Sequence, residues 1–408
     1  MSTVAADRIS DFQPFGMEFR NNPHPFYPAL LAQSPLRVEV GGEPAVVVSG
    51  YRQVRHILSH HKEFSSVKPA GVPGMEKVDF FNSRPVMNYT DPPQHTMLRR
   101  IVNPAFAPRN LEKLRIKAAA LADEIIAELR DKPDFDAVED FGYPFSRRLL
   151  MNTFMGVPDE DQYIFMDWLK AIPLLDKVQP GEGKPKAFTD AWDAGTAYCE
   201  AALKRVDRDG SENIVRLIAD ASDSGKISSD DVMATMLVLF AGGLTTVSAT
   251  TGSALLKLTE YSEVSQRIRQ DPELAGRHFE ETLRLNPALT SVMRFPKEDF
   301  EFHGMEIARN TPLYVMLSAA CHDPEEFADP LKFDIDRPNY REHMGFGAGQ
   351  HTCIGNVISR AVVPPLIAAV ARAFPNLHRS RPDEALVFDV ANPRVRHLAR
   401  VRLAAGPA

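Results

Sequence analysis

Cysteine is scarce in this chain, which has three in 408 residues. So few cysteines exclude a disulfide framework and indicate a reducing compartment. Charged residues interrupt the segment from Met1 to Asn22, so nothing there resembles a signal peptide or an anchor. We therefore expect an untargeted, cytoplasmic protein.

Positive charge is not in excess. The chain has 47 Lys and Arg against 54 Asp and Glu, which gives a net charge of −7. It lacks the general basic field that binds nucleic acid, and we expect no such partner. With 44% hydrophobic and 25% charged residues, the composition is that of a globular protein and excludes a disordered or collagen-like chain.

Long uncharged runs are rare. The segment from Val232 to Leu256 carries no charge and is long enough to span a bilayer. Ten of its 25 residues are Gly, Ser or Thr, so it is only moderately apolar. A helix of this kind is predicted to run through the centre of the protein, and we expect no membrane association.

The pattern of apolar residues predicts a mainly α fold with a smaller β-rich part. Helical spacing is found over Leu111–Arg130, Lys204–Ala221, Asp231 onward and Pro272–Leu285. Short β-rich segments are Leu36–Val40, Ala45–Val48, Phe300–Phe302, Leu313–Met316, Ala385–Asp389 and Val401–Leu403. These are too few and too short for a large parallel sheet. Pro364 and Pro365 predict a bend in the helix over Asn356–Phe374.

The segment FGAGQHTCIG, Phe346 to Gly355, is the most informative. Three glycines surround one cysteine ahead of an apolar helical run, so the backbone can approach a flat, bulky group closely. A helix start favours a thiolate, which makes Cys353 a candidate metal ligand. No second cysteine lies nearby, which excludes a four-cysteine zinc or iron–sulfur site. A buried structural cysteine beside a glycine turn is the alternative.

The spacing Phe346-x-x-Gly349-x-x-x-Cys353-x-Gly355 resembles the haem-binding loop of the cytochrome P450 family, and the resemblance extends over nearly the whole chain. It implies the cytochrome P450 fold, with haem b between the central helix and the cysteine loop. Cys353 would be the axial thiolate to iron, and Phe346, Gly349 and Gly355 would contact the cofactor. Residues 1–408 would form a single haem domain without a fused reductase or ferredoxin.

Glu281 and Arg284 lie three residues apart on one predicted helix face. Alone, such a pair is usually a solvated surface pair. By its position before the cysteine loop, it resembles the family's structural Glu–Arg pair, and Arg337 matches the third member.

Four further residues are expected at the cofactor. Asp91, Pro92 and Pro93 form a helix-start signal, and His95 and Arg99 follow at a spacing that places both on one face. An exposed polar face is the alternative. The resemblance implies that these two side chains bind the haem propionates, together with Arg294 and His351.

The central helix departs from the family pattern. The usual sequence is Ala/Gly-Gly-x-Asp/Glu-Thr, whereas this chain reads FAGGLTTV and has no acid. Thr246 would supply the hydroxyl near oxygen, and Thr245 would occupy the position of the acid. Threonine relays a proton but cannot supply one as a carboxyl group does. Another proton route, slow turnover or use of peroxide remain open, as does a structural role in which each hydroxyl bonds the carbonyl four residues earlier.

The resemblance implies a monooxygenase that inserts one atom of O2 into a small or medium hydrophobic substrate, such as a terpenoid, aromatic or steroid-like compound. Residues expected at the substrate are Gly242, Gly243, Val292 and Val395. Electrons would come from a separate ferredoxin and ferredoxin reductase, and the protein would be a monomer. Candidate docking cations are Arg99, Arg100, Lys113, Arg115 and Lys117.

Two alternatives belong to other classes. One is a haem-thiolate protein that is driven by peroxide, or that binds a ligand or senses a gas without oxidation. The other is a hydrolase that uses Cys353 as nucleophile with a histidine such as His351.

Overall fold

The computed structural model describes residues 9, 11–69, 81, 86–178, 182–205, 214–227, 229–389 and 394–405. The chain divides into two compact units, each built from segments that are distant in sequence. The first, here called the sheet unit, comprises Met1–Ser65, Arg115–Phe145 and Thr246–Ala408. The second, here called the helical unit, comprises Ser66–Leu114 and Ser146–Thr245.

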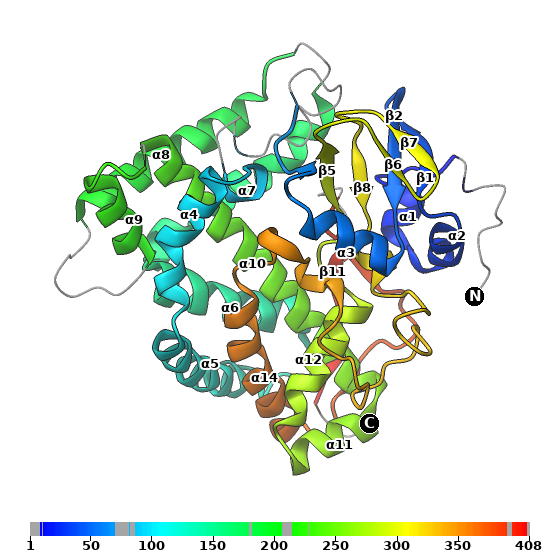
Figure 1. Ribbon diagram of the computed structural model, residues 1–408. Helices are drawn as coiled ribbons and strands as arrows, with labels where there is room; N and C mark the ends of the chain where they lie inside the picture. Colours follow the sequence, from blue (N-terminus) through cyan, green and yellow to red (C-terminus); the bar gives the residue numbers. More distant parts are fainter. Residues whose placement is uncertain are drawn as a thin grey trace. The chain divides into compact units, whose positions relative to one another are not determined.

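The helical unit contains no strand among its described residues. Its helices are η4 (Met87–Tyr89), α4 (Gln94–Val102), η5 (Asn103–Phe106), η7 (Arg147–Met155), η8 (Asp159–Asp161), α7 (Gln162–Ala171), η9 (Ile172–Lys177), α8 (Lys186–Arg205), α9 (Ile214–Asp223) and the first part of α10 (Ser229–Glu260) (Figure 1). Aromatic side chains fill its interior: the ring of Phe165 lies 4.6 Å from that of Phe240 and 5.3 Å from that of Tyr198.

All strands among the described residues belong to the sheet unit. The largest sheet has the order β1 (Leu36–Val40), β2 (Glu43–Val48), β8 (Leu313–Val315), β5 (Val292–Pro296) and β3 (Phe64–Ser65). Only the β2–β8 pairing is parallel. The smaller pairings join β6 (Phe300–Phe302) to β7 (Met305–Ile307), β10 (Val387–Asp389) to β11 (His397–Arg400), and β12 (Arg402–Ala404) to β4 (Phe135–Asp136) and β9 (His378–Arg379). The predicted strands are confirmed to within two residues at each end.

The helices of the sheet unit include α1 (Met17–Asn21), α2 (Tyr27–Ala32), α3 (Tyr51–Ser59), α6 (Tyr143–Ser146), α11 (Ser262–Gln270), α12 (Leu274–Leu285), α13 (Leu317–Ala320) and α14 (Asn356–Ala373). Helix α5 (Pro108–Leu129) begins in the helical unit and continues into the sheet unit. Helices α12 and α11 both pack on α14. Helix α14 is continuous through Pro364 and Pro365, so the bend there stays a prediction.

The helix predicted over Lys204–Ala221 is described only at its two ends. Helix α8 ends at Arg205 and α9 begins at Ile214, while residues 206–213 lie outside the described residues.

The predicted central helix is confirmed as α10, which has 32 residues. A Cβ atom on Gly252 would lie 2.6 Å from a Val138 methyl group, and one on Gly142 would lie 2.7 Å from the Ser248 carbonyl. The glycines therefore allow the π-helical segment η6 (Ala137–Gly142) to cross α10 closely. By length and composition, two described helices are apolar enough to cross a membrane, α10 and α14, and α10 is 67% buried over its most apolar window. Such burial is typical of a core helix.

Candidate cofactor site

Cys353 lies between η11 (Gly349–His351) and the start of α14, and its side chain is exposed. Cys199 and Cys321 are buried, and burial raises the pKa of each thiol to about 12. Because the thiolate is the form that binds metals, the two buried cysteines are poor ligands. Cys353 is therefore the cysteine best placed to bind an external group.

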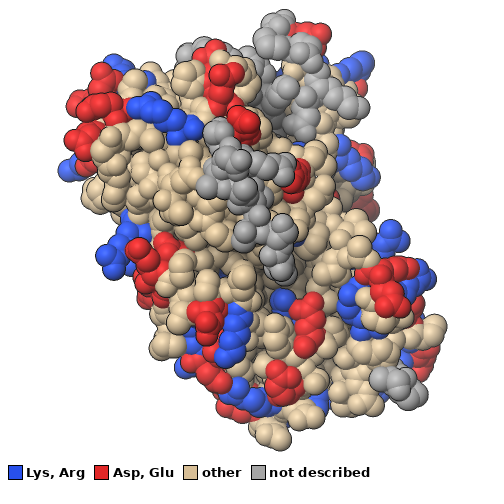
Figure 2. Space-filling model, turned by 90° about the vertical axis from the view of Figure 1, so that its right-hand side faces the viewer, with Lys and Arg blue, Asp and Glu red and all other residues tan. Residues whose placement is uncertain are grey.

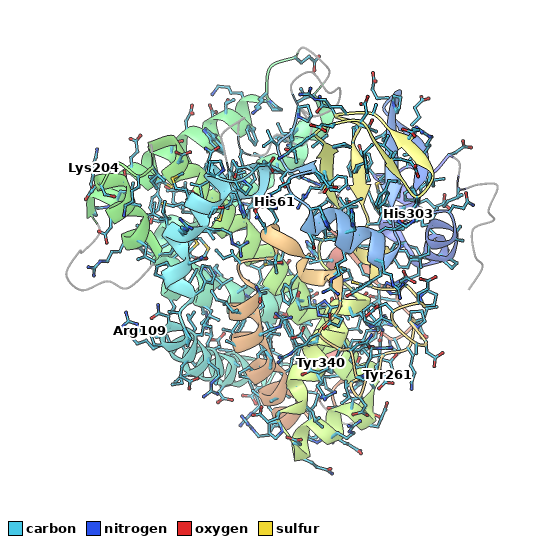
Figure 3. The ribbon with its side chains drawn as sticks, viewed as in Figure 1. His61, Arg109, Lys204, Tyr261, His303 and Tyr340 are labelled. Atoms are coloured by element: carbon cyan, nitrogen blue, oxygen red, sulfur yellow. The ribbon has the colours of Figure 1, made fainter. Side chains whose placement is uncertain are left out.

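Backbone contacts fix the loop that carries Cys353. Its N–H donates to the Phe346 carbonyl at 2.8 Å, across the end of η10 (Met344–Phe346). Gly349 has φ +69°, and a Cβ atom there would lie 2.1 Å from the Leu58 carbonyl oxygen at the end of α3. Gln350 and His61 side chains approach to 3.1 Å nearby, and His61 is labelled in Figure 3. A Cβ atom on Gly355 would lie 3.7 Å from the Cys353 sulfur.

Replacing Gly349 with alanine should displace the cysteine loop, because the new methyl group would overlap the backbone of Leu58. Gly304, on the turn between β6 and β7, is the control: it has φ +78°, and a Cβ atom there would meet nothing within 4 Å. Both substitutions place an alanine at positive φ and lower the free energy of unfolding by about 1–3 kcal/mol, but only Gly349→Ala also incurs the overlap. Urea unfolding should show a larger loss for Gly349→Ala, and equal losses would contradict the close packing of loop and α3.

Beneath this loop, Glu281 and Arg284 form a fully buried ion pair on α12. Arg284 Nε donates to Glu281 Oε2 and Nη2 donates to Oε1, both at 2.8 Å. The Arg337 Nε donates to the same Oε1 at 3.3 Å. The structure thus brings the three predicted members together.

The two arginines also hold the irregular segment before the cysteine loop. Arg284 donates to the carbonyls of Cys321, Pro330 and Lys332 at 2.9, 2.7 and 3.1 Å. Arg337 donates to the Ala328 carbonyl at 2.6 Å. This cluster therefore stabilises the segment between α13 and η10, which has no regular secondary structure.

The four predicted propionate ligands fall into two pairs. Arg294 on β5 is buried and donates to the Met293 carbonyl at 2.7 Å, while His351 in η11 is partly buried; both belong to the sheet unit. His95 and Arg99 lie one turn apart on α4 in the helical unit, the first buried and the second partly buried. Their joint contact with one cofactor stays a prediction.

One face of α10 is accessible within an otherwise buried stretch. Gly242 is exposed, and Thr245 and Thr246 are partly buried, at the i, i+3, i+4 spacing of a single helix face. A Cβ atom on Gly242 would meet nothing within 4 Å, whereas one on Gly243 would lie 3.0 Å from Leu150. The Thr245 hydroxyl donates to the Ala241 carbonyl at 3.3 Å, which is the structural arrangement considered for these threonines.

Two predicted substrate residues, Val292 and Val395, belong to neighbouring segments of the sheet unit. Val395 forms a β-bridge with Leu289, and the Thr290 N–H donates to the Arg394 carbonyl at 2.8 Å. Val292 begins β5 two residues after this contact. The C-terminal segment therefore lies beside the approach to β5.

Sequence reasoning missed four residues beside the loop: Glu280, His343, Asn356 and Arg360. They connect α12 to Cys353 by side-chain hydrogen bonds. The sequence feature that could have pointed to this group is a second glutamate, Glu280, directly before Glu281 in HFEETLR.

The site fits a metal that brings most of its own ligands. Among the described residues, no group of three or more His, Cys, Asp and Glu side chains could hold a metal ion. One accessible cysteine in a glycine-rich loop can supply one ligand, so the others must come from a prosthetic group. Arg294 and His351, the donors predicted for acidic groups on such a cofactor, both lie in the sheet unit. These features fit a haem-thiolate protein.

Comparisons with known proteins agree with this class. The sequence profile of the cytochrome P450 family matches residues 21–376, so the chain belongs to the cytochrome P450 family. Cytochrome P450(MEG) of Priestia megaterium is 27% identical over 379 residues, which cover 92% of each chain. The structure of CalO2 is 26% identical, with a TM-score of 0.84 over 98% of this chain and 99% of that one. Myxobacterial CYP267B1 in complex with myristic acid is 25% identical, with a TM-score of 0.84 over 97% and 99%.

The predicted fold, enzyme class and cofactor are thereby confirmed. The chain is a cytochrome P450 monooxygenase of the mainly α family fold, and this family uses haem b with an axial cysteine thiolate. The alternative of a cysteine hydrolase was wrong, since the family match covers most of the chain.

Proposed function

We propose that this cytochrome P450 inserts one oxygen atom from O2 into a small or medium hydrophobic substrate, with Cys353 as the axial ligand of haem iron. The observation that carries this proposal is the single exposed cysteine at the end of a glycine-rich loop packed on α3. The bound haem supplies the oxidising chemistry. The protein binds the cofactor, excludes water and orients the substrate.

Cationic and polar donors would hold the two haem propionates. A partly buried carboxylate needs charged or hydrogen-bonded partners. Arg294 and His351 would provide them from the sheet unit, and His95 and Arg99 from α4. Phe346, Gly349 and Gly355 would let the backbone lie close to the flat cofactor.

The substrate would be apolar. The residues assigned to its pocket are Gly242, Gly243, Val292 and Val395, none of which offers a polar side chain. Such a lining favours terpenoid, aromatic or steroid-like compounds. The complex of the relative CYP267B1 with myristic acid, whose chain is apolar, is in line with this class.

Thr246 would hold the oxygen-side proton relay. The residue directly before it is Thr245 and not an acid, and the Thr245 hydroxyl already donates to the Ala241 carbonyl. A hydroxyl that donates to the helix can still accept a hydrogen bond from water, but it supplies no proton of its own. Proton delivery would therefore depend on water.

Electrons would come from a separate ferredoxin and its reductase. Arg100, Lys113, Arg115 and Lys117 are exposed, and Arg99 is partly buried. These cations would attract an acidic ferredoxin. On the face drawn in Figure 2, positive and negative side chains are interspersed, so that face offers no extended basic surface for nucleic acid. We place the protein in the cytoplasm as a monomer.

The decisive experiment is haem reconstitution followed by difference spectroscopy. Wild-type protein should show a Soret band and a thiolate-type shift when reduced under CO, and Cys353→Ala should lose that shift. Cys199→Ala, which removes a buried thiol, is the control and should keep it. An unpigmented wild type unable to bind haem, or a thiolate-type spectrum in Cys353→Ala, would contradict the proposal.

Thr245 stands where the family pattern has an acid, which favours one alternative, a peroxide-driven or non-oxidative haem-thiolate protein. Product formation with a ferredoxin system and none without it would support the main proposal. Product with peroxide alone would support the peroxide-driven enzyme. Ligand-induced spectral shifts without product under either condition would support a sensor.

A further inference from the structure

Glu280 is a second buried carboxylate on α12, beside the ion pair of Glu281. Its side chain is 3% exposed, and Oε1 accepts a hydrogen bond from Arg360 Nε at 2.6 Å. Oε2 accepts from Arg360 Nη2 at 3.2 Å and from His343 Nε2 at 2.8 Å. Burial raises the pKa of Glu280, but the hydrogen bonds from His343 and Arg360 outweigh it and hold the pKa below its ordinary value. The carboxylate is therefore ionised, with Arg360 as its closest cation.

His343 connects Glu280 to the amide side of Cys353. When its Nε2–H donates to Glu280, Nδ1 is left as an acceptor, and it accepts the N–H of Gly345 at 3.1 Å. This contact caps η10. The last residue of η10, Phe346, accepts the N–H of Cys353 at 2.8 Å. The turn before the cysteine is thus tied to α12.

Arg360 connects Glu280 to the carbonyl side of Cys353. Its Nη1 donates to Asn356 Oδ1 at 2.9 Å, and Asn356 Nδ2 donates to the Cys353 carbonyl. The guanidinium also lies over the Phe346 ring, 4.7 Å from its centroid. One buried carboxylate therefore anchors both peptide groups that flank the Cys353 side chain.

We propose that Asn356 and Arg360, anchored by Glu280, are positioning residues that set the orientation and electron density of the Cys353 ligand. The inference rests on the proposed role of Cys353 as axial ligand. Hydrogen bonds to groups around a metal ligand orient it and tune the metal's reduction potential. The Asn356 amide places the positive end of its dipole at the Cys353 peptide, which favours the reduced state of the bound iron.

The test is a redox titration of the substrate-free holoprotein. Asn356→Ala removes the donor to Cys353, and Arg360→Lys keeps the charge opposite Glu280 but cannot bond Asn356 at the same time. Each should shift the reduction potential to more negative values. The double variant should shift it no further than the larger single change, because both residues act through one chain of hydrogen bonds. Arg360→Lys also avoids an unpaired buried carboxylate.

A destabilised variant of the same unit provides the control. Leu403 is fully buried in β12, and Leu403→Ala should cost about 2–5 kcal/mol but leave the potential at the wild-type value. Unmoved potentials in Asn356→Ala and Arg360→Lys, additive shifts in the double variant, or an equal shift in Leu403→Ala would overturn the inference alone. A wild type without the thiolate-type spectrum would overturn the role of Cys353 and this inference with it.

Discussion

Arg284→Met should lower the free energy of unfolding by about 3–5 kcal/mol. The change removes the cation paired with Glu281, whose side chain is 0% exposed, and leaves a buried carboxylate with Arg337 Nε at 3.3 Å as its nearest remaining cationic donor. It also removes the donor to three carbonyls in the segment before the cysteine loop. Urea unfolding monitored by circular dichroism measures the loss.

The same sheet unit offers a control with similar geometry and opposite burial. Arg267 forms a bidentate pair with Asp336, at 2.8 and 2.7 Å, but these side chains are 42% and 62% exposed. Water already solvates both charges there, so Arg267→Met should cost only about 0–1 kcal/mol. A loss in Arg284→Met no larger than that in Arg267→Met would show that the buried pair is not a major source of stability.

His278→Leu should make the protein more resistant to acid. His278 is fully buried on α12 beside the Phe333 ring, which stacks on Tyr261 (labelled in Figure 3). Burial, with a smaller contribution from Lys257, lowers the pKa of His278 from 6.5 to about 3. Neither ring nitrogen has a hydrogen-bond partner among the described residues. Leucine fills a similar volume without a polar atom.

Proton binding explains why His278 makes the folded state less stable as the pH falls. Between about pH 6 and pH 4, the unfolded chain protonates His278 and the folded chain does not, so acid favours unfolding. Each pH unit in that window costs about 1.4 kcal/mol. Unfolding free energies measured across the window should fall less steeply in His278→Leu, by about that slope.

At neutral pH the His278→Leu variant should match or exceed the wild type by up to about 3 kcal/mol, since two unsatisfied buried nitrogens are removed. His303→Asn is the control, because His303 is exposed on the turn between β6 and β7. It should retain the wild-type slope. Parallel pH curves for wild type and His278→Leu would show that the buried imidazole is not protonated on unfolding.

Sequence spacing was sufficient to predict contacts within local motifs. The contact between Glu281 and Arg284 follows from one helix turn, and the position of Cys353 from its loop. The contact of Glu280 with Arg360 depends on how α12 packs on α14, which no spacing within either helix specifies. Likewise, a glycine is needed at position 349 because the backbone of Leu58 in α3, about 290 residues earlier, leaves no room for a Cβ atom. Tertiary packing, and not local pattern, decided these features.

The unequal burial of the three cysteines gives this protein an internal reporter. Buried thiols with a raised pKa react slowly with alkylating reagents, whereas an exposed thiol reacts readily. In the folded chain, rapid alkylation should therefore be confined to Cys353, and iron ligation should protect it. The number of quickly modified thiols per chain then measures the fraction of molecules that lack cofactor, independently of any absorbance band.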